Sequence, residues 1–237
     1  MGDDQMVAEL EKFERGEVPS IFGEFEFSVD EEPVSQQAKS QTKKPLKKSI
    51  QQKIKNLQYT LTGDLKIEIR WMVYPKHRYE SHKAVDIDNI IKPILDSLAG
   101  PYGLMVDDTQ IQDIGCYWMD WTDQEKHRID IKVKHSPDEF LKKQGLEFME
   151  IKSGLCLPIS IWFENGVEYS DDKAFKAKKI IAETWKKQFE LSDKCEKDGL
   201  DWHSASFVRP IQRLFHKNKL LGWVDQGYEI KSIDCYL

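Results

Sequence analysis

The chain has 237 residues, of which 40% are hydrophobic and 32% are charged. This composition is typical of a soluble globular protein and excludes a disordered or fibrous one. No apolar run approaches eighteen residues, and the acidic start "MGDDQMVAELEKFERGE" has neither a basic segment nor an apolar core of a secretory signal. The sequence therefore predicts a cytoplasmic protein without a membrane span.

The four cysteines are widely separated and form no CxxC pair, so neither a zinc ribbon nor a disulfide framework is expected. The net charge of −6 is unevenly distributed. Residues 1–34 contain eleven acidic and two basic residues, whereas residues 35–62 contain seven lysines and no acid. Because local potential decides whether phosphate is attracted, this basic segment keeps nucleic acid open as a partner. A solvated helix face is the alternative reading of the same lysines.

The spacing of apolar residues predicts alternating strands and helices in the first half. In chain order these are a strand at 25–29, a helix at 46–57, a strand at 66–73, a helix at 88–98, and strands at 111–121 and 128–135. Residues 76–84 are expected to form a polar loop, and the last two strands to form a hairpin. We predict a small mixed sheet with helices packed on it, an α+β fold.

The pattern restarts after Pro137. Residues 155–172 indicate a hairpin around Asn165-Gly166, a preferred turn pair. An amphipathic helix is expected over 171–190, and a further helix over 206–223 with a kink near Pro210. The predicted organisation is an acidic leader (1–21), an α+β domain (22–137) and a second α+β domain (138–237) whose role the sequence does not reveal.

Two acidic pairs surround the helix at 88–98. Asp86 and Asp88 precede it, and Asp107 and Asp108 follow about twenty residues later. In an extended backbone Asp86 and Asp88 point to one side, and Asp88 suits the N-cap of the helix. Lys92 then lies one turn above Asp88. Helix capping and turn formation are the alternative to a shared site for these acids.

Converging carboxylates repel one another unless a cation lies between them. Oxygen ligands without a nearby histidine or cysteine favour Mg²⁺, or Mn²⁺ as its substitute, over zinc. Such an ion could activate water and stabilise the leaving oxygen of a phosphodiester, with Lys92 neutralising charge on the phosphate.

The stretch "DIDNIIKPILDSLAG…VDDTQI" resembles the core motif of the RusA-type Holliday-junction resolvases: D-x-D-N, a lysine four residues after the second Asp, L-D-x-L, and D-D-x-Q. The resemblance covers about residues 22–135. It implies a small α+β nuclease that acts as a homodimer and makes magnesium-dependent, paired nicks in branched DNA. By position, Asp86, Asp88 and Asp108 match the metal-binding acids, and Lys92 matches the catalytic lysine. Asp107 matches the acid beside the ligand and is expected to be a further metal ligand.

In these resolvases the segment before the first Asp is often arginine-rich, whereas in this chain it is the mixed "KHRYESHKA". We therefore expect lysines elsewhere to contribute to phosphate binding. The expected DNA-contacting residues are basic and lie in two segments: Lys47, Lys48, Lys53, Lys55, Lys76, Arg78 and Lys83. Two alternatives remain: a module that binds branched DNA without cutting it, with the C-terminal half recruiting a protein partner, and a metal-dependent nuclease acting on another nucleic acid.

Overall fold

The computed structural model describes residues 3–80, 86–123, 126–160, 163–164 and 167–237. The chain forms two compact units, residues 1–140 and 141–237, compared with the boundary at 137/138 expected from the sequence. The α+β class predicted from the sequence is confirmed, since helices and mixed sheets occur in the structure. No helix in the described ranges is long and apolar enough to span a membrane.

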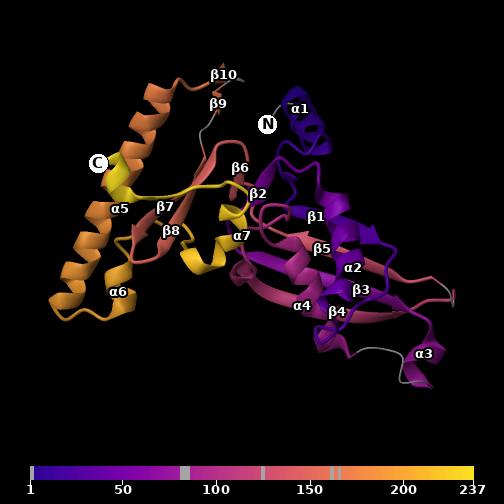
Figure 1. Ribbon diagram of the computed structural model, residues 1–237. Coiled ribbons are helices and arrows are strands. Elements are labelled where there is room, and N and C mark those ends of the chain that lie inside the picture. Colours follow the sequence, from indigo (N-terminus) through magenta and orange to yellow (C-terminus); the bar gives the residue numbers. More distant parts are fainter. Residues whose placement is uncertain (1–2, 81–85, 124–125, 161–162, 165–166) are drawn as a thin grey trace. The chain divides into compact units, whose positions relative to one another are not determined.

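The first unit is built on a four-stranded sheet in the order β1-β5-β3-β4 (Figure 1). Along the chain its elements are α1 (Asp3–Glu14), β1 (Glu24–Val29), α2 (Ser40–Ile54), β2 (Tyr59–Leu61), β3 (Leu65–Val73), α3 (Pro75–Tyr79), α4 (Ile87–Leu98), the 3₁₀ turn η1 (Asp108–Gln110), β4 (Ile111–Asp120) and β5 (Arg128–Lys134). All six elements predicted for this half are present, and α3 occupies part of the expected loop.

The predicted hairpin of the last two strands is wrong. β4 pairs in parallel with β3, and β5 pairs antiparallel with β3 on its other side and with β1. A parallel neighbour requires a crossover connection, and α4 lies between β3 and β4 in the chain. In this order β3 and β5, whose residues are the most buried, lie at the centre of the sheet, and the more exposed β4 lies at an edge.

The helices α2 and α4 pack together and bury their apolar stripes on one face of this sheet (Figure 1). Leu46, Ile50 and Ile54 of α2 are buried, as are Ile90 and Ile94 of α4. Full burial of one such side chain stabilises the fold by about 1.5–3 kcal/mol. This packing fixes α4, and with it the acidic motif, against the sheet.

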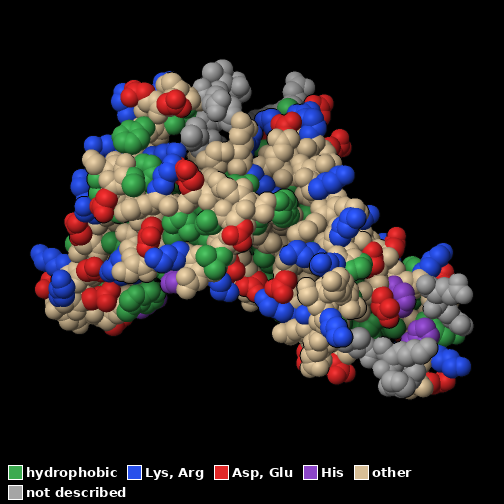
Figure 2. All heavy atoms as spheres, in the orientation of Figure 1, with side chains coloured by type: hydrophobic (Ala, Val, Ile, Leu, Met, Phe, Trp, Pro, Cys, Tyr) green, Lys and Arg blue, Asp and Glu red, His purple; other side chains and the backbone are tan. Residues whose placement is uncertain are grey.

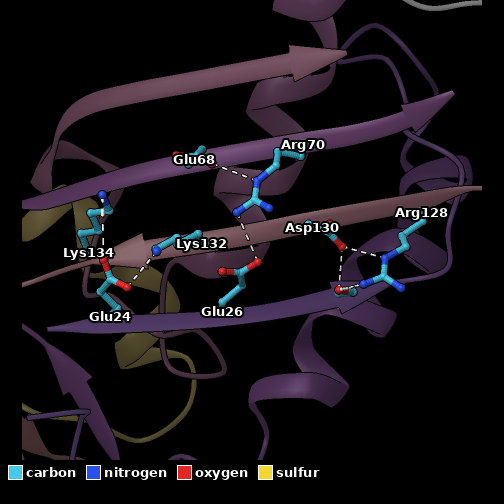
Figure 3. Close-up of polar contacts among 9 residues, drawn as sticks. Glu24, Glu26, Glu68, Arg70, Arg128, Asp130, Lys132 and Lys134 are labelled. Atoms are coloured by element: carbon cyan, nitrogen blue, oxygen red, sulfur yellow. Dashed lines mark hydrogen bonds and ion pairs between the residues drawn. The ribbon is translucent and has the colours of Figure 1, made fainter. Parts of the chain in front are cut away.

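The other face of the sheet carries a ladder of cross-strand ion pairs (Figure 3). Arg70 of β3 contacts Glu26 of β1 and Glu68 of its own strand, and Lys132 of β5 contacts Glu24. The ladder contains four basic and four acidic side chains: Arg70, Arg128, Lys132, Lys134, Glu24, Glu26, Glu68 and Asp130. Because these charges neutralise one another, this face has little attraction for phosphate.

The second unit contains a sheet in the order β11-β8-β7-β12 with the long helix α5 packed against it. Its elements are β6 (Phe140–Lys142, which begins at the unit boundary), β7 (Leu146–Lys152), β8 (Leu155–Ser160), β9 (Phe163–Glu164), β10 (Val167–Glu168), α5 (Asp171–Lys197), α6 (Trp202–Ser206), β11 (Phe215–His216), η2 (Lys217–Lys219), α7 (Leu221–Val224), β12 (Ile230–Ser232) and η3 (Ile233–Tyr236). Met149, Leu157 and Trp185 are among its core residues.

Two predictions for this unit meet different outcomes. β9 and β10 pair as the expected short hairpin, although Asn165-Gly166 lies outside the described residues. The predicted helix over 206–223 is wrong: α6 ends at Ser206, and β11, η2 and α7 follow. Pro210 disfavours helical backbone at the residue before it. Phe215 instead pairs with Cys156 of β8 and is buried.

Candidate active site

The acidic motif lies at the start of α4. The helix begins at Ile87, with Asp86 in the N-cap position and Asp88 in the first turn, so the expected N-cap at Asp88 and the extended Asp86–Asp88 segment are wrong. The Asp86 side chain makes no capping hydrogen bond. Both carboxylates are exposed. Asp86 and Asp88 are therefore accessible to a ligand at the positive end of the helix dipole.

Pro93 lies inside α4 and lacks the N–H that would bond to the carbonyl of Asn89. That carbonyl instead accepts a hydrogen bond of 2.7 Å from the backbone N–H of Gln36. The Ser97 hydroxyl donates to the Pro93 carbonyl at 2.6 Å. The proline therefore leaves no carbonyl without a hydrogen bond. The bond from Gln36 also connects the segment before α2 to the start of α4, where the acids lie.

The second acidic pair has two distinct roles. Asp107 is only 9% exposed and caps η1: its carboxylate accepts from the Thr109 N–H at 3.1 Å and forms a reciprocal capping box with Gln110. Gln110 also donates to the carbonyls of Leu61 (3.0 Å) and Gly63 (2.8 Å). Asp107 and Gln110 therefore hold the D-D-x-Q turn in place. Asp108, the next residue in the turn, has no part in the capping box.

Lys92 connects the two parts of the motif. Its ammonium donates to Asp108 Oδ2 at 2.5 Å and lies 2.7 Å from Asp96 Oδ1. Burial alone would lower the pKa of Lys92, but the hydrogen bonds and charges of Asp108 and Asp96 outweigh it, and the pKa is raised. Lys92 therefore remains positively charged, and it holds Asp108 against the helix whose first turn carries Asp88.

The side chains present have the chemistry of a site for a hard cation, since all the candidate donors are carboxylate oxygens. Their arrangement is looser than a closed metal centre. Within the described ranges, no three histidine, cysteine or acidic side chains are grouped so as to hold a metal ion. Of the four acids, Asp108 forms an ion pair with Lys92 of α4, and Asp107 caps η1. Asp86 and Asp88 are exposed.

The expected DNA-contacting residues that the structure describes lie on or directly after two helices of the first unit. Lys47, Lys48 and Lys53 are exposed on α2, and Lys55 is exposed at its C-terminal end. Since α2 packs against α4, these lysines belong to the helical layer that carries the acids. Figure 2 shows basic and acidic side chains interspersed on the face in view, without one large patch of a single sign.

Lys76 and Arg78 are exposed on α3. The Arg78 guanidinium lies 5.0 Å from the ring centre of Tyr79 and 5.3 Å from that of Trp118, which in turn stacks on Trp71 at 4.2 Å. Trp118 packs against the cluster around Ile90 of α4, which places this cation–aromatic stack beside the acidic helix. Lys83 lies outside the described residues.

Two further residues contribute to the site, although the sequence did not assign them to it. Asp96 shares Lys92 with Asp108, and its spacing four residues after Lys92 is the signal that could have found it. Trp118 supports Arg78, but β4 was expected to pair with β5, so nothing in the sequence linked it to α3 or α4.

These features define an α+β domain with an acidic, lysine-bridged site at the start of one helix. Residues 30–134 match the family model described as Endodeoxyribonuclease RusA, and this match identifies the first unit as a RusA-type domain. A comparison of the chain with curated proteins found no match. The resemblance to the RusA-type resolvases, drawn from the motif, is therefore confirmed, and the family's description names an endodeoxyribonuclease activity.

Proposed function

We propose that the protein is a magnesium-dependent, structure-selective endodeoxyribonuclease that resolves branched DNA such as Holliday junctions by hydrolysing phosphodiesters in paired strands. The observation that carries the proposal is the Lys92–Asp108 ion pair, which joins α4 to the D-D-x-Q turn in a domain of the RusA family. Metal ions and positive side chains both stabilise the charge that develops on a phosphate during hydrolysis, and this pair brings a candidate metal ligand, Asp108, to a positive side chain, Lys92.

Asp86, Asp88 and Asp108 are the proposed ligands of Mg²⁺, with Mn²⁺ as its substitute. When bound, the ion supplies Lewis-acid stabilisation to the substrate phosphate. Asp107 as a further ligand stays a prediction, because its carboxylate caps η1. Lys92 donates to one carboxylate oxygen of Asp108, and an ionised carboxylate accepts from several partners, so Asp108 would hold the cation with or without this ion pair. The Lys92 ammonium would offset charge on the substrate phosphate.

The proposed DNA surface is the helical layer of the first unit rather than the paired-charge ladder. The exposed lysines of α2 and the Lys76 and Arg78 side chains of α3 are its sequence-independent phosphate contacts. Arg78 on its aromatic support offers a planar cation to a phosphate or a base. Paired nicks in two strands require two active sites, so we also propose that the protein acts as a homodimer.

A cleavage assay on defined substrates tests this function. The purified chain is mixed with a four-way DNA junction, linear duplex, single-stranded DNA and RNA, each with Mg²⁺ or with a chelator. We expect junction cleavage that requires the cation, and loss of cleavage with retained binding in Asp86→Asn and Asp88→Asn. Asp113→Asn is the matched control, since Asp113 is an exposed acid on β4 of the same unit.

The alternatives predict different outcomes of the same assay. Salt-dependent junction binding without cleavage of any substrate would favour the binding module. Preferential cleavage of RNA or unbranched DNA would replace the substrate while keeping the chemistry. Equal loss of activity in Asp113→Asn would show that the acids at α4 have no special role.

A protein partner for the second unit and a cytoplasmic location both stay predictions. The partner is supported by large apolar side chains that solvent reaches after α5, namely Trp202 (62% exposed), Phe207 (76%) and Ile211 (100%). Replacing Phe207 and Ile211 by serine should leave junction cleavage by the isolated protein unchanged, which separates this surface from the nuclease.

A further inference from the structure

A cavity of about 510 Å³ in the second unit is walled by lysines from three separate segments. Lys143 lies in the turn between β6 and β7, Lys178 on α5 and Lys231 on β12. Two acids, Glu147 and Glu229, also line the cavity, so cationic lining residues outnumber anionic ones by three to two. The volume lies in the range of sites that bind small molecules.

Glu147 fixes two of these lysines. It is only 6% exposed, and its Oε1 lies 2.7 Å from the Lys178 ammonium and accepts a 2.7 Å hydrogen bond from the Tyr236 hydroxyl. Its Oε2 lies 3.2 Å from the Lys231 ammonium. Burial alone would raise the pKa of Glu147, but the hydrogen bonds from Lys178, Tyr236 and Lys231 outweigh it and lower the pKa. Glu147 is therefore ionised at neutral pH and holds both ammonium groups in place.

Lys178 and Lys231 retain hydrogen-bonding capacity toward a ligand. Each ammonium has three N–H donors. Among the described residues, Lys178 pairs with Glu147 alone, and Lys231 pairs with Glu147 and Glu229. Burial lowers the pKa of Lys143 to about 8, so its charged form would be stabilised by an anion brought into the cavity.

We propose that this cavity binds an anion that carries a phosphate group, held by the ammonium groups of Lys143, Lys178 and Lys231. A phosphate presents several acceptor oxygens to several donors at once, which a single carboxylate does less well. The phosphate could belong to a small compound or to the backbone of DNA. The site involves the second unit alone, so it does not depend on the proposed nuclease function.

Calorimetric titration of the full chain with inorganic phosphate tests the proposal. We expect saturable binding, weakened at least about tenfold in Lys143→Met and unchanged in Lys186→Met, a matched lysine exposed on α5 and outside the cavity. No saturation by about 10 mM phosphate, or equal weakening in both variants, would overturn the proposal.

A variant with the opposite expected effect separates binding from misfolding. Glu229 is exposed and lies 2.5 Å from the Lys231 ammonium, so Glu229→Gln removes a negative charge at the cavity without burying a new group. Phosphate should then bind several times more tightly, and weaker or unchanged binding would contradict the proposal. Competition of bound phosphate with a mononucleotide and with a short DNA duplex identifies which kind of molecule carries the phosphate group. Displacement of phosphate by the duplex would assign the site to the DNA backbone. Displacement by the mononucleotide alone would assign it to a small compound.

Discussion

Replacing Lys92 by methionine should separate the catalytic role of this residue from its structural one. Methionine keeps most of the apolar stem but removes the ion pairs with Asp96 and Asp108. The side chains are 41% exposed for Lys92, 55% for Asp96 and 23% for Asp108, so both pairs are partly screened by water. Each such pair contributes about 0.2–1 kcal/mol, so we expect the loss of both to lower the free energy of unfolding by about 0.4–2 kcal/mol.

The loss of activity should be much larger. Removing a positive donor that stabilises developing charge costs roughly 10²-fold or more in the cleavage rate. The same variant should bind Mn²⁺ more tightly, because Asp108 is released and a nearby positive charge is removed. Single-turnover cleavage of a four-way junction, urea unfolding and Mn²⁺ titration measure the three quantities separately.

The matched control is Lys66→Met, which removes an ion pair with Asp113 whose two side chains are 66% and 63% exposed. It should leave all three quantities nearly unchanged. Cleavage by Lys92→Met within a few fold of the wild-type rate, together with reduced stability, would contradict a catalytic role for Lys92. Lys92 would then have only a structural role, the ion pair that holds Asp108 beside α4.

Three further predictions concern other parts of the chain. Asp107→Ala should lower the free energy of unfolding by about 0.5–2 kcal/mol, because the cap of η1 is lost. Asp108→Asn should instead abolish cleavage with little effect on stability. The reverse pattern would assign the cap to Asp108 and the catalytic role to Asp107. Glu147→Gln should lower the free energy of unfolding by about 3 kcal/mol at pH 7, because Lys178, whose side chain is only 15% exposed, loses its acidic partner. Folding lowers the pKa of Glu147, so the stability contributed by its charge is present above the unfolded pKa of about 4.3 and is lost as the pH falls through the folded pKa. The free energies of unfolding of the variant and the wild type, measured with urea, should therefore converge in acid. A constant difference between them would contradict this prediction. Replacing both Lys47 and Lys48 by glutamine should reduce the salt dependence of junction binding by about two phosphate contacts, and an unchanged slope in a salt titration would remove α2 from the DNA surface.

The predicted elements of the first unit were found because their apolar residues keep strict periods. β3 buries every second residue from Leu65 to Val73, and α4 buries Ile90, Ile94 and Leu98. The strand order does not follow from these periods. Both β4 and β5 alternate well enough to pair with each other, and the parallel pairing of β4 with β3 depends on the crossover through α4, which the residues of β4 do not encode.

The candidate site was predictable in its residues but not in its contacts. The motif located Lys92 and Asp108, whereas their ion pair depends on how η1 lies beside α4. The role of Asp107 was readable from the D-x-x-Q spacing of a capping box. In the second unit, the predicted helix after residue 206 failed because Phe215 is buried by pairing with β8, a long-range contact that local periodicity does not encode.

Crystallising the protein with Mn²⁺ and locating the ion by its anomalous signal tests the proposed cation site most directly. We expect a peak within bonding distance of the carboxylates of Asp86, Asp88 and Asp108, about 2.0–2.3 Å away. A fully occupied peak elsewhere, or no peak beside these three carboxylates at saturating Mn²⁺, would contradict the claim that these acids form one cation site.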